Sequence, residues 1–253
     1  SPYEQNNWLS KSVSSNISKY MSSSLANPSC NGLVKNDFYG FVKSSGRLDV
    51  LKLLKSFTKH FSKTNNFINE KFYHNKLIIK DDYFLYKSII SKKIIFCEGM
   101  SLIHNPFFTN INLKPTKGEI LTIYCKGLDL NSIIHAGFLL VPLGNNYYSL
   151  GATYDGDVNN TKPTKDAKIK MITILDKIIN LPYTIVNHYT GIRPSTSDRR
   201  ALIGSHRDYK NMYMLNGLGT RGVLLAPYLS KSLLDNIYLK EIINSEVNVH
   251  RFY

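Results

Sequence analysis

The most informative stretch of the sequence is Asn216-Gly217-Leu218-Gly219-Thr220-Arg221-Gly222. It places Gly-x-Gly-x-x-Gly between a predicted strand at 212–215 and a predicted helix at 222–239. Glycines at such a turn let backbone N–H groups approach a ligand oxygen, and the helix N-terminus favours negative charge. A full dinucleotide-binding fingerprint also needs a second strand and an acidic residue about 20 positions further on. Glu241 lies near that distance but not at the end of a predicted strand. Two interpretations remain open: a helix N-terminus that faces an anionic group, and a glycine-rich turn chosen only for its backbone.

A second candidate site lies upstream of the glycine-rich stretch, at Gly191-Ile192-Arg193-Pro194. The guanidinium group of Arg193 suits two-point recognition of a substrate carboxylate better than a lysine would. The alternative is a structural arginine that pairs with Asp198, five residues further on.

The remaining pattern predicts a mixed fold. Helices are expected at 2–21, 49–61, 164–178 and 222–239, and strands at 32–42, 76–79, 83–86, 93–97, 118–124, 137–141, 147–152, 183–193, 201–203 and 212–215. Ser1, Asp49 and Thr164 are the expected N-caps of the first three helices. The strands and helices interleave irregularly, so the fold class is α/β in a mixed α+β form with a substantial antiparallel share.

Three details of this pattern concern packing. The helix at 49–61 is expected to turn Val50, Leu54, Phe57 and Phe61 inward. The apolar strand at 93–97 is expected to be covered on both faces. A turn at 142–145 should join the strands on either side of it into a hairpin.

Composition narrows the possible functions. The formal net charge is +14, but the basic residues occur singly or in pairs and form no stripe with aromatic residues, so no nucleic-acid partner is expected. The three cysteines form no Cys-x-x-Cys pair and the histidines show no ligand spacing, so we expect no metal site and a reducing compartment. No apolar run approaches the ~20 residues that cross a bilayer, and the polar opening of the chain does not resemble a signal peptide. The expected location is cytoplasmic, without a membrane span.

Several short motifs, taken in order, resemble the D-amino-acid oxidase and glycine oxidase branch of the FAD-dependent oxidoreductases. Each motif is weakly specific by itself, but their order and spacing match those of the family. The similarity covers nearly the whole chain. The motifs are 92–99 (KKIIFCEG), 114–121 (KPTKGEIL), 151–154 (GATY), 191–194 (GIRP), 203–204 (IG), Gly217 and 224–227 (LLAP).

The resemblance implies an enzyme that oxidises an amine or amino acid to an imine by transferring a hydride to FAD. It implies that Arg193 binds the substrate carboxylate. The cofactor-binding residues that it implies are Glu98, Gly99, Asn216, Gly217, Leu218, Gly219, Thr220, Arg221, Gly222 and Val223. Because positions 188–222 contain no cysteine, the flavin should be bound non-covalently.

The resemblance also implies two discontinuous domains. Residues 1–45 and 113–189 should form a substrate domain with a large mixed or antiparallel sheet. Residues 46–112 and 190–253 should form the C-terminal part of a Rossmann-like FAD-binding domain.

Two departures from the family pattern qualify the expected activity. The family begins with a βαβ unit that carries its own glycine fingerprint, and these 253 residues do not include one, so we expect this chain to bind FAD weakly or not at all. Some members also have a substrate-binding tyrosine just before the Val-Pro of the hairpin strand, where residues 138–142 read FLLVP. The alternative to an enzyme is therefore a non-catalytic binding domain, or an inert fragment unable to hold FAD alone.

Overall fold

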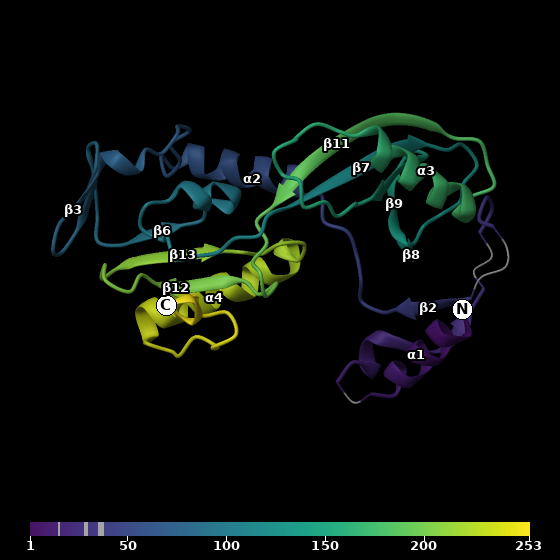
Figure 1. The fold of residues 1–253 in the computed structure, drawn as a ribbon, viewed down its shortest axis with the longest axis horizontal. Helices are drawn as coiled ribbons and strands as arrows, with labels where there is room; N and C mark the ends of the chain where they lie inside the picture. The colour runs from purple at the N-terminus through teal and green to yellow at the C-terminus, as the bar shows by residue number, and fades with distance from the viewer. Residues whose placement is uncertain (15, 28–29, 35–37) are drawn as a thin grey trace. The chain divides into compact units, whose positions relative to one another are not determined.

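The computed structural model describes residues 1–14, 16–27, 30–34 and 38–253. The chain folds into two compact units, each assembled from separate segments. Unit 1 contains Ser1–Arg47, Gly118–Tyr154 and Thr161–Gly191, and unit 2 contains Leu48–Lys117, Asp155–Asn160 and Ile192–Tyr253. The expected mixed α/β class is confirmed, with antiparallel pairing in every sheet (Figure 1). Among the described residues, no helix combines the length and apolarity needed to cross a bilayer.

The core of unit 1 is a five-stranded sheet with strand order β11-β7-β10-β9-β8. The strands are β7 (Thr116–Tyr124), β8 (Ile134–Ala136), β9 (Phe138–Gly144), β10 (Tyr147–Gly151) and β11 (Thr184–Arg193). Helix α3 (Lys165–Ile178) buries Met171 and Leu175 in the core. Leu140 of β9 and Leu150 of β10 belong to the same apolar cluster, so the helix packs on the sheet.

The hairpin of β9 and β10 is confirmed, but its turn lies at Asn145-Asn146 and not over the whole of 142–145. Both asparagines have positive φ, at 51° and 62°. Asparagine tolerates this conformation better than other non-glycine residues, and it is common in two-residue hairpin turns. Pro142 lies within β9, opposite Tyr148.

The N-terminal helix of unit 1 is shorter than predicted. Helix α1 (Pro2–Ser12) has the expected Ser1 cap but ends at Ser12, and a short 3₁₀ helix, η1 (Ser18–Tyr20), follows. Residues predicted as the end of the helix and a loop instead form β1 (Met21–Ala26), which pairs with β2 (Tyr39–Val42).

A tertiary contact of the Trp8 side chain accounts for this difference. The indole Nε1 of Trp8 donates a 3.0 Å hydrogen bond to the Ser22 carbonyl, and its ring lies so close to Gly40 that any Cβ there would be 2.0 Å away. Helix propensity is a weak preference that such packing overrides. The predicted strand at 32–42 is observed only at Tyr39–Val42, and its residues 35–37 lie outside the described part of the chain.

Unit 2 contains a three-stranded sheet with strand order β12-β13-β6. Its strands are β6 (Ile94–Phe96), β12 (Leu202–Ser205) and β13 (Met212–Asn216), each close to its predicted position. β12 runs antiparallel to β13, whereas β6 runs parallel to β13. Helix α4 (Gly222–Leu239) packs on this sheet through Leu229 and Leu233.

The rest of unit 2 surrounds this sheet and its aromatic core. Strands β3 (Leu77–Ile79), β4 (Phe84–Tyr86) and β5 (Ile89–Ser91) form an antiparallel meander. The other short elements are the 3₁₀ helices η2 (His74–Lys76), η3 (Gly99–His104) and η4 (Val249–Phe252). The sequence pattern does not predict β5, or β8 of unit 1.

Two predictions about burial in unit 2 are wrong. Helix α2 (Val50–Lys63) has the expected Asp49 cap, but its apolar face is exposed: Leu54 is 56% and Phe57 51% accessible. Strand β6 is the edge strand of its sheet and is not covered on both faces, since Ile95 is 40% accessible. Periodicity shows which face of an element is apolar, but it does not show whether the described part of the chain supplies a partner for that face.

Candidate functional site

The glycine-rich loop connects β13 to α4 and is held by the side chain of Asn216, which is 3% accessible. Its Nδ2 donates a 3.0 Å hydrogen bond to the Gly99 carbonyl, and its Oδ1 accepts one from the Gly217 N–H at 2.8 Å. Gly217 and Gly219 have positive φ, at 67° and 54°. A side chain is disfavoured at both positions, so the glycines meet a real backbone requirement.

Glu98 and Gly99 lie beside this loop because β6 and β13 are parallel neighbours and their carboxyl ends meet at one edge of the sheet. The Glu98 carboxylate accepts a 2.7 Å hydrogen bond from Asn105 Nδ2 and lies 2.7 Å from His74 Nε2. An ionised carboxylate can accept about four hydrogen bonds, so these two contacts leave capacity for a ligand.

The first turn of α4 presents free backbone donors. The Gly219 N–H donates to the Pro194 carbonyl at 3.3 Å, and the first bond of the helix runs from the Leu225 N–H to the Arg221 carbonyl at 2.9 Å. The N–H groups of Gly222 and Val223 have no acceptor within the described chain. Donors of this kind, together with the helix dipole, favour an anion at this end of α4.

Arg193 ends β11 in unit 2, and the residues after it contact the glycine-rich loop. Its Nη1 donates to the Lys117 carbonyl at 3.3 Å. The Pro194 carbonyl accepts from Gly219, and a Cβ at Gly217 would approach the Thr196 methyl to 3.0 Å. The structure therefore brings the Arg193 segment, the glycine-rich loop and Gly99 together within unit 2.

Asp198 does not pair with Arg193, so the suggested pairing between these two residues is wrong. The Asp198 carboxylate instead accepts hydrogen bonds from Arg251 Nε at 2.7 Å and Arg251 Nη2 at 3.3 Å. Burial raises the pKa of Asp198, but the hydrogen bonds from Arg251 and from the Arg200 N–H outweigh it, and the pKa falls to about 2. This pair fixes the C-terminal η4 to the segment that follows Arg193.

Replacing Asp198 by asparagine should destabilise the protein in a pH-dependent way. Because the folded-state pKa lies below the ordinary value of 3.8, the carboxylate stabilises the fold above pH ~4 and loses this effect as the pH falls towards about 2. The side chain is 38% accessible, so screening reduces the stabilisation to about 1 kcal/mol at pH 7. Urea unfolding at several pH values would measure the difference. Asp81→Asn, at an exposed carboxyl without an ion pair in the described chain, should show no such trend, and a pH-independent difference for Asp198→Asn would contradict the prediction.

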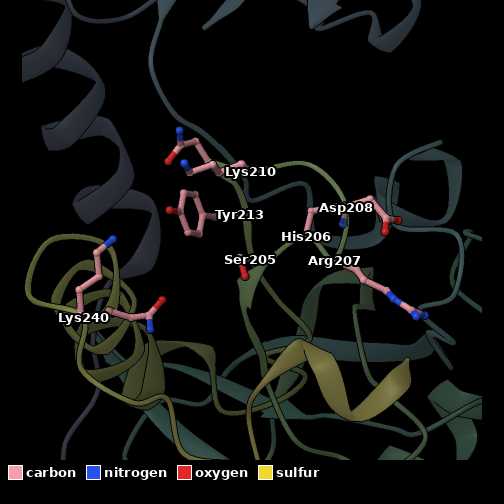
Figure 2. Close-up of a pocket in the computed structure, with 9 residues that line it drawn as sticks. Ser205, His206, Arg207, Asp208, Lys210, Tyr213 and Lys240 are labelled. Atoms are coloured by element: carbon pink, nitrogen blue, oxygen red, sulfur yellow. The ribbon is translucent and has the colours of Figure 1, made fainter. Parts of the chain in front are cut away.

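A hollow of about 390 Å³ lies at the opposite end of β13 and is lined by none of the residues predicted from the sequence. Its lining includes Tyr213, Lys210 and Lys240 (Figure 2). Sequence reasoning missed these residues, because isolated lysines and tyrosines form no recognisable motif. No group of three potential metal ligands occurs in the part of the chain that the structure describes.

Comparison with known proteins identifies the family to which the chain is similar. The family model described as "FAD dependent oxidoreductase" matches residues 37–235. Glycine oxidase from Bacillus subtilis (strain 168) is 28% identical over 145 residues, which cover 54% of this chain and 39% of that protein.

Two solved structures share the fold. Iminodiacetate oxidase from Chelativorans sp. BNC1 has a TM-score of 0.67 at 19% identity, covering 87% of this chain and 62% of that one. L-proline dehydrogenase from P. horikoshii has a TM-score of 0.72 at 15% identity, covering 94% and 66% respectively. The chain spans between 26% and 39% of the length of the curated relatives that it matches.

Proposed function

Since this chain belongs to the family of FAD-dependent oxidoreductases, we propose that it is part of an enzyme that oxidises an amine or amino acid to an imine. The observation that carries the proposal is the hydrogen bond from Asn216 Nδ2 to the Gly99 carbonyl. It joins the carboxyl ends of two parallel strands, which is where open α/β sheets bind their ligands. The names of the similar proteins, glycine oxidase, iminodiacetate oxidase and L-proline dehydrogenase, each refer to an amine that carries a carboxylate.

The residues of this edge fit a flavin cofactor. We propose that residues 216–223 hold its pyrimidine side and that Glu98 and Gly99 lie near its adenosine. When bound, the flavin would accept the hydride from the substrate's α-carbon. The unpaired N–H groups of Gly222 and Val223 would stabilise negative charge there by ~0.3–1 kcal/mol, or more in a dry site. The chain contains no cysteine between 188 and 222, so we expect the attachment to be non-covalent.

The proposed substrate contact is the guanidinium of Arg193. Its Nη1 is oriented by the Lys117 carbonyl, and an arginine fork can bind both oxygens of a carboxylate. The residues after it are hydrogen-bonded to the glycine-rich loop, which supports a role in orienting substrate against the cofactor. Orientation and electrostatics are the protein's contribution in flavin chemistry, so no catalytic acid or base is proposed.

Unit 1 is the proposed substrate domain, and unit 2 is the proposed C-terminal part of the FAD-binding domain. Two features of unit 2 support the idea that further chain completes it. The apolar face of α2, with Leu54 and Phe57, is exposed, and β6 presents an open edge next to a parallel neighbour. Parallel strands are normally covered, and curated relatives are longer than this chain.

The 253-residue chain should therefore carry little flavin when purified, whereas the full-length protein should bind FAD non-covalently. The visible absorbance of oxidised flavin relative to protein, measured before and after adding FAD and removing the excess, would give the occupancy. The full-length protein should release its flavin on acid denaturation. Near-stoichiometric flavin on the 253-residue chain would contradict the prediction, and a full-length protein without flavin would favour a non-catalytic binding domain.

A further inference from the structure

The hollow at the start of β13 is formed by two parts of unit 2: the β12–β13 connection and the end of α4. Its lining residues include Ser205, Lys210, Tyr213, Asn236 and Lys240 (Figure 2). Its volume of about 390 Å³ lies within the range of sites for small molecules, roughly 300–1,000 Å³.

Tyr213 gives this hollow a hydroxyl that no residue of the described chain uses as a hydrogen-bond partner. Its side chain is more than nine-tenths buried, at 7% accessible, and no hydrogen bond reaches its hydroxyl from the described part of the chain. In Figure 2 the hydroxyl points into the open space between the side chains of Lys210 and Lys240. Burial raises the pKa of Tyr213, so the hydroxyl stays protonated and can donate a hydrogen bond. The hydroxyl does not count among the buried side-chain atoms that lack a partner in the described chain, so solvent reaches it and a ligand could take the place of that water.

The neighbouring polar groups differ from Tyr213, because they already have partners. His206 Nε2 lies 2.6 Å from the Phe107 carbonyl, and its Nδ1 accepts from the N–H groups of Asp208 and Tyr209. Asn236 Nδ2 donates to a backbone carbonyl at 2.7 Å. The donors left for a ligand thus include the tyrosine hydroxyl, the Lys210 ammonium and those N–H bonds of Lys240 that do not point at the Ile237 carbonyl.

The charge around Tyr213 is positive. Lys210 and Lys240 approach the hollow from its two sides (Figure 2). Its lining also includes the cationic Arg207 and the carboxylate residue Asp208, so three cations face one carboxylate and the net charge stays positive. The C-terminus of α4 contributes a partial negative charge of about half a unit, which two full ammonium charges exceed. Lys240 Nζ also lies 3.4 Å from the Ile237 carbonyl, so this ammonium already offsets part of the helix dipole.

We propose that this hollow binds the phosphate group of a small molecule, with Tyr213, Lys210 and Lys240 as its donors. Two ammonium groups match the charge of a phosphate dianion, and lysine binds phosphate as a point charge without needing the planar geometry of arginine. The space exceeds what a bare phosphate needs, which leaves room for an organic part. The proposal does not rest on the flavin site, since the two sites lie at opposite ends of the five-residue strand β13, about 16 Å apart.

Calorimetric titration of the 253-residue chain with inorganic phosphate at low ionic strength tests the proposal. The wild-type chain should bind at one site. Tyr213→Phe keeps the ring and removes only the hydroxyl, so it should weaken binding about tenfold, as expected for loss of a hydrogen bond to a charged group. Lys210→Gln and Lys240→Gln should each weaken it by a similar factor, and added salt should weaken it further.

A parallel titration with ribose 5-phosphate separates the two sources of phosphate. Tighter binding than that of inorganic phosphate would identify an organic phosphate as the ligand, and equal binding would identify free phosphate. Tyr228→Phe, on the exposed face of α4, and Lys177→Gln, in unit 1, are matched controls that should bind like wild type.

The proposal is overturned if wild type shows no phosphate binding, or if Tyr213→Phe and both lysine variants bind within twofold of wild type. Circular dichroism melting of each variant establishes that it is folded. Because each of the three positions is tested separately, one variant that fails to fold leaves two independent measurements.

Discussion

Replacing Arg193 by lysine in the full-length protein is expected to reduce kcat/KM by a factor that corresponds to about 1.5–3 kcal/mol, the range for a hydrogen bond to a charged group. Lysine keeps the positive charge but loses the planar fork that can bind both carboxylate oxygens. The backbone at this position is fixed by Pro194, whose carbonyl accepts a hydrogen bond from Gly219. The arginine is therefore held by a rigid segment, as a substrate clamp requires.

Steady-state kinetics with amino-acid substrates would measure this loss, and flavin absorbance should stay unchanged because the proposed cofactor residues are untouched. Arg200→Lys is the matched control. Arg200 belongs to the same connection but pairs with Glu246 at the surface, 3.2 Å away, so its replacement should leave kcat/KM close to wild type. Near-wild-type efficiency in Arg193→Lys would make Arg193 a structural residue.

Replacing Glu119 by alanine should be the most destabilising of these changes, lowering the free energy of unfolding by about 3–5 kcal/mol. Glu119 is 1% accessible, and its carboxylate accepts hydrogen bonds from the Thr164 N–H and hydroxyl, both at 2.9 Å. His188 Nε2 lies 2.8 Å from the same carboxylate. All three residues belong to unit 1. Thr164 would lose the acceptor of both hydrogen bonds, His188 would lose the carboxylate beside its Nε2, and the first turn of α3 would lose a negative charge.

Urea unfolding of the 253-residue chain would measure the loss in free energy of unfolding. It can be followed by circular dichroism and by fluorescence of the single tryptophan, Trp8 of unit 1. Asp166→Ala removes an exposed carboxylate from the same first turn of α3 and should cost no more than about 1 kcal/mol. Equal losses in the two variants would show that burial and hydrogen bonding of Glu119 contribute little.

Features that depend on neighbours a few residues apart can be predicted from the sequence alone. The N-caps Ser1, Asp49 and Thr164 can be predicted because each side chain bonds a backbone N–H three residues on. The same locality explains why the glycine-rich turn between β13 and α4 can be recognised. The ordered series of motifs also identifies the family, since it depends only on residue types and spacing.

Contacts between segments far apart in the sequence, in contrast, become visible only in the folded chain. Asn216 bonds to Gly99, which is 117 residues away, and Asp198 pairs with Arg251, which is 53 residues away, although Arg193 lies much nearer in sequence. The early end of α1 likewise reflects tertiary contacts, and the apolar face of α2 has no partner in the described chain. Hydrophobic periodicity is a property of one segment, whereas the choice of partner depends on the burial and hydrogen bonding of the whole fold, so these contacts cannot be derived from local pattern.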